Sequence, residues 1–162
     1  MSKNKLQILN VKIENKVDES PDLSFLGEYS RRATSPCAID RVARGDAGRN
    51  EFQYFNPEMT GEETGNPESP EQDYQRMESY NRGEWHMVGI IAKAEIRNPA
   101  TDCTQVIRSG GLWGVESDGG EYLNDVAKEQ LSELAIELRA FAGGIGERAI
   151  AHAIKNCIAS LV

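Results

Sequence analysis

Two stretches of the chain alternate apolar and polar residues with the period of two that is typical of half-buried strands. The first covers residues 6–17, and the second, which is the clearest, covers residues 85–97. A turn follows the second stretch, and residues 103–108 then repeat the strand pattern, which predicts an antiparallel hairpin. Shorter strand patterns cover residues 51–55 and 112–116. The apolar face predicted for the first strand consists of Leu9, Val11 and Ile13.

Apolar residues that recur every three or four positions predict two amphipathic helices near the end of the chain. The longer covers residues 121–142 and the shorter residues 147–161, with a glycine-rich link between them. A third helix is predicted up to about Asn81, because Ser69 and Pro70 match an N-cap followed by a first-turn proline. The apolar stripe of the longest helix consists of Leu123, Val126, Ala127, Gln130, Leu131, Leu134, Leu138 and Phe141.

The order of these elements, strands first and helices last, favours an α+β fold in which helices pack on one face of an antiparallel sheet. We expect a single domain over residues 1–142, with an acidic loop at residues 57–70, and a C-terminal helical extension over residues 143–162. The terminal helix is marginal alone in water, so its apolar stripe must pack on something. It either folds back onto its own sheet or pairs with a second chain, and we expect a homodimer through residues 147–161.

The charge and composition of the chain argue against several classes of function. The chain has 162 residues and a net charge of −8, from 18 Lys and Arg against 26 Asp and Glu. A domain this acidic is not expected to bind nucleic acid directly through its overall charge. No apolar run reaches about 18 residues, so no membrane span is expected. Residues 1–5 are followed by a strand pattern interrupted by polar residues rather than by an apolar h-region, so no signal peptide is expected either. The three widely spaced cysteines favour a reducing cytoplasm over a disulfide framework.

No constellation of residues predicts catalysis, a cofactor or a metal ion. The two histidines, His86 and His152, lie far in sequence from a second soft ligand. No cysteine carries a local signature of activation, and no Gly-x-Ser-x-Gly motif is present. Residues 144–149 match a dinucleotide fingerprint but follow a helix rather than a strand. We therefore expect a protein without enzymatic activity, although a hydrolase or transferase built from scattered Glu, Arg and Tyr stays open.

Acidic residues gather in two segments. Residues 51–80 carry a net charge of −7 and residues 112–137 a net charge of −6. They form either solvated faces that keep the protein soluble, or a surface that presents carboxylates to an Arg- and Lys-rich partner as a phosphate backbone does. Trp113, set among glycines, is either a core residue, which we favour, or an exposed partner anchor. The candidate partner-binding residues are Glu62, Glu63, Glu71, Asp73, Trp113, Glu116 and Asp118.

Residues 109–118 read SGGLWGVESD. With residues 20–27, 81–95 and 121–134, this motif resembles a family of small acidic proteins of bacteriophages and bacterial mobile elements. The resemblance covers about residues 17–142 and carries no known activity. It implies a cytoplasmic accessory protein that blocks host defence by binding a nuclease or a CRISPR-type complex. We therefore expect an inhibitor that binds a basic surface of a host protein or protein–nucleic-acid complex, and mimicry of nucleic-acid charge is the mode of binding that the acidic segments suggest. The alternative is an accessory or structural protein whose acidity serves only solubility.

Overall fold

The computed structural model describes residues 5–141 and 144–161. The chain forms two compact units. One, the terminal unit, comprises the segments up to Glu19 and from His86 onwards, and the other, the inserted unit, comprises Ser20–Trp85. This division differs from the single domain predicted over residues 1–142, because residues 20–85 form a small core of their own. The strands of this segment are too short to show an extended pattern of alternating residues in the sequence.

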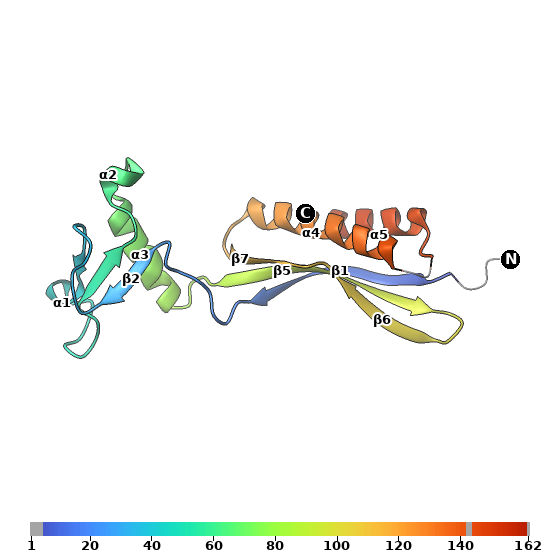
Figure 1. The fold of residues 1–162 in the computed structure, drawn as a ribbon, viewed down its shortest axis with the longest axis horizontal. Helices are drawn as coiled ribbons and strands as arrows, with labels where there is room; N and C mark the ends of the chain where they lie inside the picture. The colour runs from blue at the N-terminus through green and yellow to red at the C-terminus, as the bar shows by residue number, and fades with distance from the viewer. Residues whose placement is uncertain (1–4, 142–143, 162) are drawn as a thin grey trace. The chain divides into compact units, whose positions relative to one another are not determined.

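The terminal unit is built on a four-stranded antiparallel sheet (Figure 1). Its strands are β1 (Gln7–Val17), β5 (Met87–Asn98), β6 (Cys103–Arg108) and β7 (Leu112–Glu116). The long central strand β5 pairs with β1 along one edge, whereas β6 and β7 share its other edge. The predicted hairpin between residues 85–97 and 103–108 is therefore confirmed.

A register shift in β1 changes which of its residues face the core. Ile8 pairs with Ile96 and Asn10 with Glu95, so Leu9 is the extra residue of a bulge. A bulged residue has no cross-strand partner and is released from the strict alternation of the pleat. Leu9 is consequently 49% exposed, and the prediction that it lies on the buried face was wrong.

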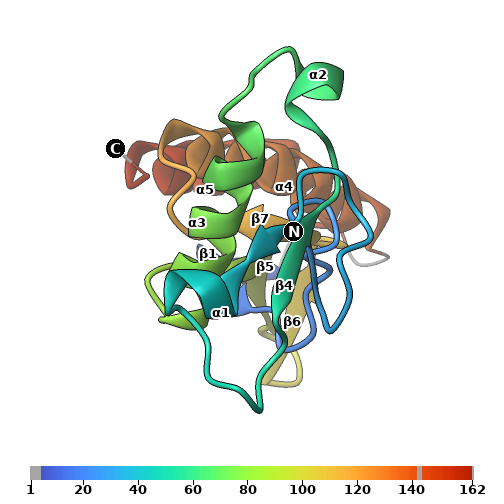
Figure 2. The same ribbon diagram turned by 90° about the vertical axis from the view of Figure 1, so that its left-hand side faces the viewer.

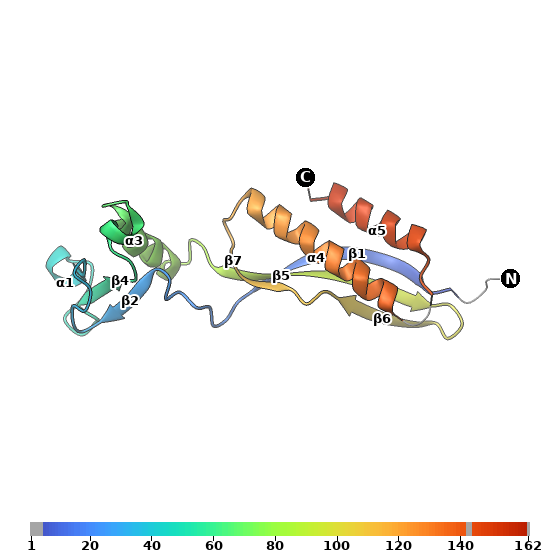
Figure 3. The same ribbon diagram turned by 45° about the horizontal axis from the view of Figure 1, so that its top comes forward.

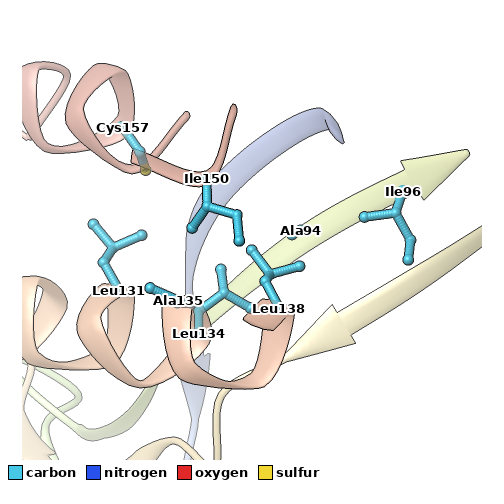
Figure 4. Close-up of a cluster of buried hydrophobic side chains, with 9 residues drawn as sticks. Ala94, Ile96, Leu131, Leu134, Ala135, Leu138, Ile150 and Cys157 are labelled. Carbon is cyan, nitrogen blue, oxygen red and sulfur yellow. The ribbon is translucent and has the colours of Figure 1, made fainter. Parts of the chain in front are cut away.

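Helices α4 (Glu121–Ala140) and α5 (Glu147–Ala159) cover one face of this sheet, and α5 returns antiparallel beside α4 (Figure 3). Figure 4 shows their apolar side chains meeting above Ala94 and Ile96 of β5. The buried members of this cluster are Ala92, Ala94, Ile96, Leu131, Leu134, Ala135, Leu138, Ile150 and Cys157. The mixed α+β class, with a long helix followed by a shorter terminal one, is thus as predicted.

The terminal helix packs on its own chain. Ile150 is fully buried and Cys157 nearly so, and Ile154, Ile158 and Leu161 pack partly buried against the same cluster. An ion pair between Arg139 and Glu147 links the two helices at 3.0 Å. The apolar stripe that led us to expect a homodimer is therefore covered within the monomer, which is the fold-back alternative, and residues 147–161 belong to the terminal unit rather than to an extension.

The inserted unit contains a three-stranded antiparallel sheet with the order β2 (Gly27–Ser30), β4 (Tyr54–Pro57), β3 (Ile39–Asp40). Helix α3 (Ser69–Asn81) packs on this sheet, and the short α1 (Arg41–Arg44) follows β3 directly (Figure 2). Its core is aromatic. Phe55 is fully buried between Tyr29 and Tyr74, with ring centroids 5.4 Å away on each side.

The predicted acidic loop at residues 57–70 contains a short helix, α2 (Gly61–Thr64). Thr60 accepts a hydrogen bond from the backbone N–H of Glu63, and the Glu63 carboxylate accepts one from the backbone N–H of Thr60 at 2.7 Å. This reciprocal capping box satisfies two donors at the helix start. The sequence prediction of an irregular loop missed it because a single helical turn is too short to show a period.

Candidate functional site

Two of the four acidic residues predicted to bind a partner in the inserted unit are engaged within the protein. The Glu71 carboxylate accepts two hydrogen bonds from the Arg44 guanidinium, at 2.9 and 2.7 Å. The hydrogen bonds from Arg44, and a further one from Gln75, lower the pKa of Glu71. Glu63 serves the capping box described above. These two carboxylates therefore stabilise local structure in the inserted unit.

The other two differ in exposure. Glu62 is exposed on α2, whereas Asp73 is half-buried on α3. Burial raises the pKa of the Asp73 carboxyl, so the fold favours its neutral form more than free solution does. The four residues thus do not form one uniform acidic surface, and Glu62 is the member best placed to meet a partner.

A different set of acids forms a regular array. We call Glu121, Asp125, Glu129, Glu133 and Glu137 of α4 the acidic row. They are four residues apart and all exposed, so successive carboxylates are separated by about 6 Å along the helix axis. Among the ion pairs of the described residues, the only one that involves the row joins Asp125 to Lys128 at 3.0 Å. Like charges four residues apart on a helix repel one another, so the acidic row slightly lowers the stability of α4. A contribution to stability therefore does not explain why these five residues are acidic.

Glu116 and Asp118 lie just before this helix. Glu116 ends β7, where it pairs with Met87 of β5, and Asp118 is exposed in the turn that leads to α4. Their position extends the acidic segment of the sequence towards the start of the acidic row. Glu116 and Asp118 therefore lie close to the start of α4, whereas the candidate residues between 62 and 73 belong to the inserted unit.

The first residues of the SGGLWGVESD motif form a buried polar clamp between the sheet and α4. The Ser109 hydroxyl donates to Oε1 of Gln130 at 2.7 Å and accepts from the backbone N–H of Ala92 at 3.0 Å. The backbone N–H of Gly111 donates to the same Gln130 oxygen at 2.9 Å. Because these buried polar groups are hydrogen-bonded, their burial has only a small free-energy cost. The clamp thereby holds the segment between β6 and β7 against α4.

Trp113 lies flat on the sheet face opposite the helices. A Cβ atom at Gly89 would lie 2.5 Å from Cδ2 and Cε3 of the indole and 2.8 Å from Cε2, so the ring covers this glycine. Trp113 nevertheless stays 45% exposed. The expectation of a core position was therefore wrong: a glycine in β5 makes room for the ring on the surface of the sheet.

Sequence reasoning missed a largely buried ionic network in the inserted unit. Arg41 is 8% exposed, and its guanidinium lies 4.4 Å from the ring centroid of Tyr29. It donates to Oε1 of Glu78 at 3.2 Å and to the backbone carbonyl of Phe52 at 3.0 Å, while the Tyr29 hydroxyl donates to the same Glu78 oxygen. Burial, followed by the bond to Glu78, raises the pKa of Tyr29 far above its usual range, so the phenol stays neutral. No sequence signal sets Arg41 apart from the other arginines of this polar segment.

The described residues, 5–141 and 144–161, contain no group of three or more His, Cys, Asp or Glu side chains that could hold a metal ion. In the same part of the chain, no helix is both long and apolar enough to cross a membrane. No known protein family, curated protein or solved structure matches the chain. The resemblance to proteins of phages and mobile elements therefore stays a prediction.

The three cysteines are expected to differ in reactivity. Cys103 is exposed, Cys37 is half-buried and Cys157 is buried. Because burial raises the pKa of the Cys157 thiol, less of it is in the reactive thiolate form at a given pH. Iodoacetamide at pH 8 should modify Cys103 first and Cys157 last, as followed by mass spectrometry of peptides. Equal rates for Cys103 and Cys157 in the folded protein would show that α5 does not stay packed, and in urea the difference should vanish.

Proposed function

We propose that the protein is a non-enzymatic inhibitor that binds a basic surface of a host defence complex, of the nuclease or CRISPR type, through the acidic row of α4. The observation that carries the proposal is the row itself. Five carboxylates at regular spacing lie on one rigid helix, which is anchored to the sheet by the Leu131, Leu134 and Leu138 side chains. Rigid placement lets a partner's Arg and Lys side chains bind without ordering the acidic surface first.

The charge density of the row suggests which basic surface it fits. One carboxylate about every 6 Å is sparser than one strand of B-DNA, which has a phosphate every 3.4 Å or so of helix axis. The row therefore resembles a nucleic acid in sign and linearity but not in density. It suits a partner groove in which basic side chains are spaced apart, and electrostatic attraction there would act mainly on the association rate.

The resemblance of residues 17–142 supplies the biological setting of this proposal, which is the cytoplasm of a bacterium that carries a phage or mobile element. The alternative, an accessory or structural protein whose acidity serves solubility, assigns no role to the regular spacing of the row. The two differ in one measurable respect. An inhibitor loses its partner when the row is neutralised, whereas a solubilising surface tolerates the same change.

Three forms of the tagged full chain test the proposal: the wild type, E129Q/E133Q/E137Q, and the control E58Q/E62Q/E68Q. Both variants remove three exposed carboxylates, so their net charges are equal, but the control changes the inserted unit. From a bacterial lysate the wild type and the control should capture a nuclease or CRISPR-type complex, and the row variant should not. With the purified complex, the row variant should associate on the order of tenfold more slowly, and binding should weaken as salt rises.

Equal capture by all three proteins would contradict a role for the row. Loss of capture with the control variant alone would move the binding surface to the inserted unit, around Glu62. An affinity that does not change between low and high salt would rule out mimicry of nucleic-acid charge. Failure of the wild type to capture any basic partner would favour the solubility alternative.

A further inference from the structure

The sheet of the terminal unit has a second face that neither helix covers. We call it the open face. In β5, residues with even numbers from Val88 to Ile96 point towards the helices and are buried, so Gly89, Ile91 and the odd-numbered residues that follow lie on the open face. The charged side chains on the open face are Lys12, Glu14, Lys16, Lys93, Glu95, Arg97, Arg108 and Glu116. Five are basic and three are acidic, in a chain whose net charge is −8.

Three of these cations lie side by side across the sheet. Lys12 pairs with Lys93, and Lys93 pairs with Arg108, so the three occupy one register row on β1, β5 and β6. Like charges placed directly opposite each other on neighbouring strands are destabilising. These three side chains, with Asn10, Glu95 and Val106, line a hollow of about 170 Å³.

Two carboxylates, Glu14 and Glu95, lie in the register rows on either side of this row and partly offset its charge. Lys93 forms an ion pair with Glu14, and that hydrogen bond, aided by the charges of Arg108 and Lys12, lowers the pKa of Glu14. Glu95 lies in the next register row, and Arg97 is held by Asp102 in the adjoining turn. Two carboxylates beside three cations leave a small excess of positive charge here, whereas the acidic row lies on the other side of the unit, on α4.

The indole of Trp113 lies on the same face, further along β5. One side of its ring rests on Gly89, which itself pairs with Lys16 of β1, and Trp113 is 45% exposed. A flat, exposed aromatic ring with a cation beside it is the arrangement on which bases of a single strand stack while the phosphates meet positive charge. Gly89 and Lys93 are four residues apart on one strand, which is about 13 Å, so an extended strand lying along β5 reaches both.

We propose that the open face binds single-stranded nucleic acid, with one base stacked on Trp113 and the backbone phosphates near Lys16, Lys12 and Arg108. Sheets with one uncovered face that carries aromatic and basic side chains are an established platform for single strands. The sequence-based expectation of no direct contact with nucleic acid rested on the net charge of the whole chain. The net charge is not evenly distributed, since the acidic row of α4 lies on one side of the terminal unit and the open face carries five basic against three acidic side chains.

The proposal does not depend on the binding of a protein partner by the acidic row. The two faces of the terminal unit are nevertheless compatible, because a nucleic-acid-guided complex offers both a basic protein surface and a single strand. The strand proposal can be tested with the purified full chain alone, so its failure leaves the function proposed above untouched.

Binding of the oligonucleotides dT12 and U12 to the full chain in 50 mM salt tests this directly. Trp113 is itself the probe, because the other tryptophan, Trp85, is 2% exposed. Stacking should quench the Trp113 fluorescence, and fluorescence anisotropy of a labelled oligonucleotide should report the affinity. With about three phosphates neutralised, the affinity should fall about 20-fold between 50 and 200 mM salt.

Two variants and their matched controls localise the site. Trp113→Ala should weaken binding about 5- to 150-fold, the usual effect of losing one stacked base, whereas Tyr122→Ala, which removes an exposed ring on α4, should not. K12E/R108E should weaken binding at least as strongly, whereas R148E/K155E, which makes the same change in net charge on α5, should have a smaller effect. The K12E/R108E pair tests the face even if Trp113→Ala does not fold.

The results that overturn the proposal are equally specific. The proposal is wrong if neither oligonucleotide binds at 50 mM salt, or if Trp113→Ala and K12E/R108E both bind with unchanged affinity. It is also wrong if K12E/R108E and R148E/K155E lose the same amount of affinity. If Trp113→Ala abolishes capture of a protein partner but leaves oligonucleotide affinity unchanged, the open face is a protein-docking surface and the proposal is wrong.

Discussion

Leu134→Ala is expected to lower the free energy of unfolding of the terminal unit by about 2–5 kcal/mol. Leu134 is fully buried on α4, where it packs with Leu131 and Leu138 against β5 and α5. Truncation removes apolar contacts and leaves a cavity that two helices and a sheet cannot close by collapsing. Chemical denaturation followed by circular dichroism measures the change.

Ile136→Ala is the matched control for this prediction. Ile136 lies on the same helix but is 61% exposed, so its truncation should change stability by no more than about 0.5 kcal/mol. Similar losses for the two variants, or a loss well below 1 kcal/mol for Leu134→Ala, would mean that α4 buries a different face.

Phe55→Ala is expected to destabilise the inserted unit by about 3–5 kcal/mol. Phe55 is fully buried in the central strand β4 and contacts the rings of Tyr29 and Tyr74 on two sides. A small unit buries a smaller fraction of its surface than a large one, so the loss of its central ring should remove most of its stability. Hydrogen exchange should show faster exchange across residues 20–85 in this variant.

Phe52→Ala provides the corresponding control, because Phe52 is close to β4 in sequence but 51% exposed. It should leave the exchange of residues 20–85 nearly unchanged. If Phe55→Ala instead accelerated exchange equally in both units, the division at Glu19 and His86 would not describe independent cores.

The elements with a sustained period could be predicted from the sequence. Alternation over residues 85–97 and a stripe of apolar residues over 121–142 each continue long enough to identify β5 and α4. The inserted unit could not be predicted in this way, because its strands are two to four residues long and its core depends on isolated aromatic residues such as Phe55. Tertiary contacts, rather than local periodicity, define that unit.

The candidate site shows the same limit. The acidic segments were evident from composition, but the engagement of Glu71 by Arg44 depends on two elements that lie far apart in sequence. Trp113 among glycines was recognised as unusual, yet its place on the sheet surface follows from Gly89 on another strand. The open face as a whole required the strand register, which places Lys12, Lys93 and Arg108 in one row.

The place of the inserted unit in the chain has a consequence for the order of folding. Val17 and Val88 are cross-strand partners, so β1 and β5 meet only after all of residues 20–85 have been made. The β5–β6 hairpin, by contrast, closes a short loop and has a far smaller entropic cost. If residues 20–85 fold first, their compact state brings the ends of β1 and β5 together and shortens the effective loop. During synthesis β1 is therefore the first strand to emerge, and it has no partner strand until β5 has been made.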